Sequence, residues 1–325
     1  MSTFLVSFGI IAFGLSLGYG IQVASHKGFL RVRMGLDRVR KGLQRIALLG
    51  INPVTVVGAL WLLDMETVSV AALPFLGCSA LLLGGALALG ASRLMGLEPR
   101  KAGAFLVCGS FTNIGSIGAL ICFLFLGERG FALVPIYKLF EEVTYYCVGF
   151  PVAKYYSRSR GPEENAWQRL KGLARDPFIL VALSAILAGG LLSASGVERP
   201  AFFKTMNSLL IPLATTLLLV SIGLAMKFRR VGIYLRECLA VSAIKFLLVP
   251  FVISLAAYGL GFGRTDDGLT LKVVIILSSM PVAFNALIPP SIYDLDLDLA
   301  NSCWFFTTSA LVAVLPLLLM VLKAI

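Results

Sequence analysis

The chain has 325 residues, of which 58% are hydrophobic and only 14% are charged, and its mean hydropathy is +0.91. A soluble domain is roughly 25% charged, so this composition excludes a soluble protein and indicates an all-α polytopic membrane protein. The net charge of +11 would suit a nucleic-acid-binding protein, but most of it falls in loops that predict membrane topology instead.

Six cysteines and one histidine limit the chemistry further. The cysteines lie within or next to apolar runs and lack metal-ligand spacing, so we interpret them as small buried side chains rather than as a disulfide framework or a zinc site. With His26 as the one histidine, we expect no histidine metal site and no cofactor. No basic segment precedes the first apolar stretch, so a cleaved signal peptide is not predicted.

Ten transmembrane helices are predicted, at ~20 apolar residues per crossing. In chain order they are expected at about 3–23, 44–63, 69–92, 103–126, 131–154, 177–196, 205–226, 237–261, 270–292 and 300–322.

Most of the 28 basic residues lie in four loops, within 27–45, 93–101, 154–175 and 227–236. With ten spans, all four loops fall on one side of the membrane. Cytoplasmic loops carry the excess of lysine and arginine, so both termini are predicted outside the cytoplasm, in a plasma (inner) membrane protein. Nucleic acid is therefore not expected as a partner.

Five helices precede the polar segment 155–176 and five follow it. An odd number of spans inverts the second copy, so we predict two inverted five-helix repeats, at 1–154 and 177–325, joined by a cytoplasmic linker. Inverted repeats are typical of secondary transporters.

The fourth and ninth helices carry residues that interrupt a helix. Gly109–Gly118 (GSFTNIGSIG) is rich in glycine and small polar residues, and Pro281–Tyr293 (PVAFNALIPPSIY) contains three prolines. Irregular backbone inside a bilayer is tolerated only where protein buries it or where it lines a cavity. Paired interruptions in corresponding positions of two halves therefore predict a binding site.

A helix break exposes N–H groups at one half-helix end and C=O groups at the other, which hold anions and cations respectively. Asn113 and Asn285 would present amides to one ligand, since an amide both donates and accepts. Small polar residues nearby add further groups or simply pack the helices together, and these two interpretations stay open for each of them. They are Ser110, Thr112, Ser116, Ser278 and Ser279.

Helix 5 places Glu141 and Glu142 near the middle of a span. A charge at the bilayer centre costs at least ~2.5 kcal/mol, so it is a functional hypothesis by default. Lys138 is three residues before Glu141 and four before Glu142, so it can pair with one glutamate. The other could carry a proton or bind sodium, or it could form a structural ion pair with Lys245 of helix 8. A free lysine would favour an anionic ligand.

At these residues the chain resembles the auxin efflux carrier family, within the wider group that includes bile-acid:sodium symporters. The resemblance extends over nearly the whole chain, and its individual motifs are modest. They are Gly18–Tyr19, Asn52–Pro53, Asn113-Ile-Gly-Ser-Ile-Gly118, Leu126-Gly-Glu-Arg-Gly130, Asp176–Pro177, Ile211-Pro-Leu, Ile222-Gly-Leu224, Met280-Pro-Val-Ala-Phe-Asn285 and Thr307–Thr308.

The resemblance implies a scaffold of helices 1, 2, 6 and 7 and a transport domain of helices 3–5 and 8–10. In the latter, broken helices 4 and 9 would cross and bring Gly115, Gly118 and Pro281 to the site. It also implies an elevator-like movement, commonly of a carboxylate. A homodimer is a candidate assembly. Relatives carry a proline where this chain has Leu120, so the helix 4 motif departs from the family.

The sequence thus predicts a secondary transporter, not an enzyme, for a small anionic solute such as a carboxylate, with Na+ or H+ as candidate coupling ions. The alternative is a membrane-embedded sensor that uses the same fold without transport.

Overall fold

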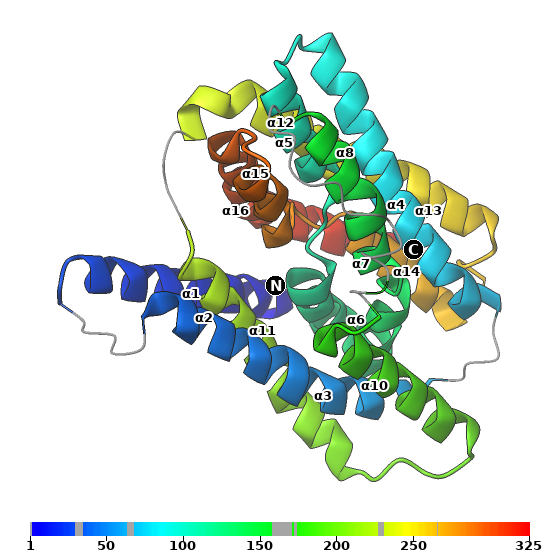
Figure 1. Ribbon diagram of the computed structural model, residues 1–325. Coiled ribbons are helices and arrows are strands. Elements are labelled where there is room, and N and C mark those ends of the chain that lie inside the picture. Colours follow the sequence, from blue (N-terminus) through cyan, green and yellow to red (C-terminus); the bar gives the residue numbers. More distant parts are fainter. Residues whose placement is uncertain are drawn as a thin grey trace. The chain divides into compact units, whose positions relative to one another are not determined.

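The computed structural model of the chain describes residues 2–29, 35–63, 68–157, 171, 174–226, 231–264 and 266–325. Within these residues all regular secondary-structure elements are helical (Figure 1). The one β-type pairing among them is an isolated bridge between Thr112 and Val282. Eight helical segments among them are long and apolar enough to cross a bilayer. The protein is therefore a multi-pass membrane protein.

The helical elements include α-helices, π-helical turns (η1, η2, η3, η5) and 3-10 turns (η4, η6, η7). In chain order they are α1 (Ser2–His26), α2 (Leu36–Arg45), η1 (Ile46–Ile51), α3 (Asn52–Leu60), α4 (Val68–Leu94), α5 (Pro99–Ser110), η2 (Ile114–Gly118), α6 (Ala119–Tyr137), α7 (Glu141–Thr144), η3 (Tyr145–Gly149), α8 (Phe150–Tyr155), α10 (Pro177–Ala194), α11 (Phe202–Gly223), η4 (Val231–Tyr234), α12 (Leu235–Ala243), η5 (Ile244–Leu248), α13 (Val249–Gly259), η6 (Asp266–Gly268), α14 (Leu269–Ser278), η7 (Phe284–Leu287), α15 (Ile288–Ile292) and α16 (Leu297–Ala324).

The expected spans at 103–126 and 270–292 are both interrupted. The first is divided into α5 and the segment that begins with η2, and the second into α14, η7 and α15. Residues 114–155 form one long apolar segment, in which Gly127 of α6 has a non-helical backbone (φ 73°, ψ −164°), at the expected turn between spans 4 and 5. The count of ten spans and the inverted repeats remain predictions.

Three π-helical turns share one cause. Pro53, Pro151 and Pro250 each lie two residues beyond the end of η1, η3 and η5 respectively. Proline lacks an N–H group, and its ring collides with the carbonyl group four residues earlier. A widened turn accommodates both defects without ending the helix.

The chain divides into two compact units. The first unit contains α1–α3, α10, α11 and residues 115–135. Within it α1 packs on α11 through Gly18 and Gly223, where an added Cβ would collide with the backbone of the facing helix. Arg199 and Glu128 form a partly buried ion pair with two hydrogen bonds, at 2.7 and 3.1 Å.

The second unit contains α4, α5, α7, α8 and α12–α16 with their intervening turns. Within it α4 and α5 lie side by side (Figure 1), and Gly84 meets Gly109 where they pack. A Cβ on Gly109 would overlap Ala88, so the absence of a side chain sets this close approach.

The assignment of helices to a scaffold and a transport domain remains a prediction. The resemblance placed all of helices 4 and 5 in the transport domain, whereas residues 115–135 belong to the first unit. Of the predicted linker 155–176, residues 158–170 and 172–173 lie outside the described residues, as do residues 30–34 and 227–230 of the basic loops.

Candidate functional site

The two helix interruptions meet inside the second unit. Helix α5 ends at Ser110, and the next residues are extended. Helix α14 ends at Ser278, and Thr112 and Val282 then pair as an antiparallel β-bridge. The two interrupted segments therefore meet at this bridge, and we call this meeting point the crossing. That they are helices 4 and 9 of two inverted repeats remains a prediction.

The bridge satisfies the backbone groups that the broken helices leave unpaired. The N–H of Asn113 donates to the carbonyl of Pro281 at 2.9 Å, and the N–H of Ala283 donates to the carbonyl of Phe111 at 3.0 Å. An unpaired backbone group inside a bilayer costs several kcal/mol, so the two segments stabilise each other.

Hydroxyl groups from two further helices hold the bridge residues. The N–H of Thr112 donates to the Tyr145 hydroxyl at 3.0 Å, from η3. The N–H of Val282 donates to Thr307 Oγ1 at 3.2 Å, from α16. Each half of the chain therefore supplies a hydroxyl to its own broken helix.

Tyr145 also connects the bridge to the charges of helix 5. Its hydroxyl lies 2.9 Å from Glu141 Oε1 and 3.2 Å from the carbonyl of Thr112. Glu141 Oε2 lies 3.0 Å from Lys138 Nζ, which is the ion pair that their spacing predicted. Glu141 is buried and pairs with Lys138, and Glu142 is half-buried.

Lys245 reaches the same bridge from η5 in helix 8. It is 1% exposed, and its Nζ donates to Thr112 Oγ1 at 2.6 Å and to the carbonyl of Ser110 at 3.2 Å. Both acceptors are neutral oxygens. The predicted alternative of an ion pair between Lys245 and a helix 5 glutamate is not the arrangement found.

Two buried polar groups on α16 lie one turn apart beside the second interruption. Trp304 Nε1 and Thr308 Oγ1 have no hydrogen-bond partner among the described residues. The Trp304 ring packs edge-on against Phe284 of η7, with ring centroids 5.7 Å apart. Buried donors without partners are costly, and a water or ligand at the interruption would satisfy them.

The remaining predicted residues are more dispersed. Asn113 is 7% exposed, whereas the Asn285 side chain in η7 is exposed. Gly115 and Gly118 lie in η2, within the first unit, and their place at the site remains a prediction.

Sequence reasoning assigned none of three contributors to this site: Tyr145, Trp304 and Thr307, although Thr307 belongs to one of the motifs that carry the resemblance. The signal for Tyr145 was its position four residues after Glu141, on the same helix face. Thr307 and Trp304 gave no local signal, because their partners Val282 and Phe284 are 20 or more residues away.

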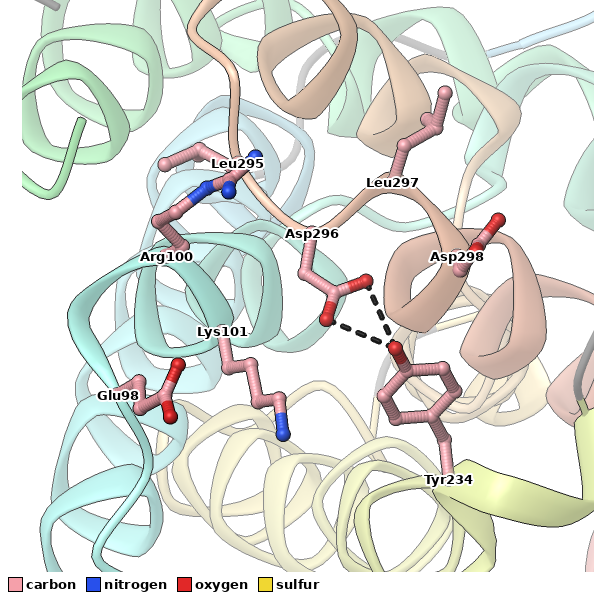
Figure 2. A pocket seen from close by; sticks show the side chains of 8 residues that line it. All are labelled: Glu98, Arg100, Lys101, Tyr234, Leu295, Asp296, Leu297 and Asp298. Atoms are coloured by element: carbon pink, nitrogen blue, oxygen red, sulfur yellow. Dashed lines mark hydrogen bonds between the residues drawn. The ribbon is translucent and has the colours of Figure 1, made fainter. Parts of the chain in front are cut away.

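A separate polar pocket of about 350 Å³ lies where α5 and α16 begin (Figure 2). The Tyr234 hydroxyl lies 2.9 Å from Asp296, whose carboxylate also caps α16 by accepting from the N–H of Leu299. At 1.5 Å per residue, α5 places the pocket roughly 15 Å from the bridge. Its lining residues are Glu98, Arg100, Lys101, Tyr234, Leu295, Asp296, Leu297 and Asp298.

No family model matches the chain. Among curated proteins it is similar to an "Uncharacterized transporter" of Methanothermobacter thermautotrophicus, 25% identical over 72% of this chain and 73% of the relative. It is 24% identical to an "Uncharacterized transporter" of Methanocaldococcus jannaschii, over 75% of this chain and 73% of the relative. It is also 24% identical to a "Putative malonate transporter" of Rhizobium meliloti, over 66% of each chain. The chain is thus related to proteins named as transporters.

Proposed function

We propose that the protein is a secondary carrier for a small organic carboxylate, and that the crossing of the broken helices in the second unit is its binding site. The observation that carries the proposal is Lys245. It is fully buried at the crossing, and its hydrogen bonds go to neutral oxygens. A buried charge that is hydrogen-bonded to neutral oxygens alone is expensive, so a bound anion would offset that cost.

Lys138 is a weaker candidate than Lys245 for binding the anion. Its ammonium group already faces Glu141 at 3.0 Å, and the pair is close to neutral as a unit. The charge balance of the crossing therefore favours an anionic ligand near Lys245 over one near Lys138.

Neutral donors near the crossing suit the rest of such a ligand. Asn285 offers an exposed amide, and Trp304 Nε1 and Thr308 Oγ1 offer groups without partners among the described residues. A carboxylate accepts hydrogen bonds from all three kinds of donor. The name of the Rhizobium relative, a malonate transporter, agrees with this substrate class.

The mechanism we propose is alternating access of the elevator type, in a member of the auxin efflux carrier family. The crossing and all the side chains that hold it belong to the second unit. A unit that contains the whole site could carry its ligand as a body. Rigid-body movement of one helix bundle against another is common in transporters with broken helices at the midplane. A sensor built on this fold would bind the same ligand without moving it.

The test is uptake of radiolabelled malonate into liposomes that contain the purified protein, with unlabelled mono- and dicarboxylates as competitors. We expect saturable uptake that Asn285→Ala reduces at least fivefold. The matched control is Ser184→Ala, an exposed hydroxyl of α10 in the other unit, which should leave uptake unchanged. Saturable binding without uptake would favour the sensor, and equal uptake by Asn285→Ala would remove Asn285 from the site.

A further inference from the structure

The end of α5 has the chemistry of a cation site. The last carbonyl groups of a helix have no intrahelical donor and carry the negative end of the helix dipole. In carriers with broken helices, such carbonyls coordinate the coupling cation. Here the carbonyl of Ser110, the last residue of α5, lies next to Thr112 Oγ1, which donates to it at 3.2 Å.

Lys245 occupies this position. Its ammonium group donates 2.6 and 3.2 Å hydrogen bonds to those two oxygens, so it makes the contacts that a bound metal cation would otherwise make. The widened turn η5 brings the side chain there, and the close contact of Gly84 with Gly109 holds α5 tightly against α4.

We propose that Lys245 is a tethered cation that takes the place of a sodium ion at the end of α5, so that the protein transports its carboxylate without sodium. A sodium ion at the same oxygens would lie beside the ammonium group, and two like charges at that distance repel strongly in a buried site. This inference rests on the proposed function where it is tested by transport, whereas the test by sodium binding is independent of that function.

The other charges near the crossing do not undo this arrangement. Glu141 reaches Thr112 only through the Tyr145 hydroxyl, and its second oxygen is taken by Lys138. The ammonium group of Lys245 bonds only neutral oxygens in the part of the chain that the structure describes, so its positive charge can face a bound carboxylate. It would stay with the protein while the anion is released.

The experiment measures labelled malonate uptake with sodium outside, and again with choline in its place. Wild-type uptake should agree within twofold between the two media. In choline, the uptake by Lys245→Ala should be at least tenfold lower than that of wild type. Millimolar n-propylammonium or sodium should restore part of this uptake, because either cation can enter the position that the lysine side chain vacates. Lys272→Ala, which removes a lysine of α14 that bonds Asp267, is the matched control and should behave as wild type.

Two results would overturn the inference: wild-type uptake that rises with sodium, or Lys245→Ala uptake equal to that of wild type in choline. Lys245→Met, which keeps most of the side-chain volume, guards against a folding defect in the alanine variant. Binding of radiolabelled sodium to the purified proteins reads the same position without any transport. Wild type should show no saturable binding, and either Lys245 variant should gain it.

The sodium-binding measurement distinguishes failure of the proposed function from failure of the proposed role of Lys245. If wild type moves no carboxylate but only the Lys245 variants bind sodium, then the proposed function fails and the tethered cation stands. If wild type binds sodium in a saturable way, then the tethered cation fails whether or not the protein is a carrier.

Discussion

Tyr145 is the residue through which the buried charges of helix 5 reach the helix crossing. Its hydroxyl accepts from the N–H of Thr112 and lies 2.9 Å from Glu141, which in turn pairs with Lys138. A hydroxyl has one proton to donate, so donation to Glu141 leaves its lone pairs for the Thr112 N–H. One oxygen atom thus fixes both the broken backbone and the orientation of the carboxylate.

Tyr145→Phe should destabilise the protein by about 1–3 kcal/mol, the cost of a buried donor left without its acceptor. We expect a lower unfolding temperature in detergent and weaker malonate uptake. Tyr258→Phe is the control, since Tyr258 of α13 is 64% exposed, and it should unfold as wild type does. Equal unfolding temperatures for all three proteins would show that the hydroxyl does not hold the crossing.

At this scale the sequence predicted residues that are linked by short spacing or by unusual type. Glu141 stood out because a carboxylate in a span is costly, and its pairing with Lys138 followed from three-residue spacing. The contact between Lys245 and Thr112 could not be predicted, because 133 residues separate the two. Nothing in the local sequence pattern of either helix indicates that these two side chains are in contact.

At the scale of elements, α5 can pack closely against α4 because Gly109 has no side chain. Gly109 lies one residue before the end of α5 and faces Gly84 of α4, while Ser110 Oγ donates to the carbonyl of Leu81 at 2.9 Å. The end of α5, where Lys245 bonds, is therefore fixed against α4 by backbone proximity. Small residues allow this kind of approach between membrane helices.

Gly109→Ala should push α4 and α5 apart, because the new Cβ would overlap Ala88 and the Gly84 carbonyl oxygen. We expect a loss of about 1–3 kcal/mol in stability, typical of an overpacked site, and a matching loss of uptake. The control is Gly90→Ala in α4, where an added Cβ meets nothing within 4 Å. Stability of Gly109→Ala equal to that of the control would show that the close approach is not required.

The interruption of both helices could be predicted, since proline and clustered glycine act on the backbone of their own segment. The β-bridge between Thr112 and Val282 could not, because it depends on which segments of the chain meet. The effect of Leu120 was also beyond prediction. The backbone opens at residues 111–113, between α5 and η2, with Leu120 in place of a proline, and Val282 supplies the pairing partner of Thr112.

At the scale of the molecule, composition and hydropathy suffice to predict a helical multi-pass membrane protein, and eight segments of the described chain meet that description. The number of spans is harder to read from the sequence. Interrupted spans such as α14, with ten residues, fall below the length of a continuous crossing.

The orientation in the membrane is a further prediction at this scale. The four basic loops predict that both termini lie outside the cytoplasm. Alkaline phosphatase fused after Ile325 should therefore be active in a bacterial host, and green fluorescent protein fused there should be dark. The reverse pattern would mean an odd number of spans or an inverted topology.

The central claim is that the crossing in the second unit binds a carboxylate whose charge is balanced by Lys245. Equilibrium binding of radiolabelled malonate to detergent-purified protein tests it most directly, with wild type, Lys245→Met and the control Lys272→Met compared at equal monodispersity. We expect saturable binding that Lys245→Met weakens at least tenfold and that Lys272→Met leaves unchanged. Equal affinity of wild type and Lys245→Met for malonate would contradict it.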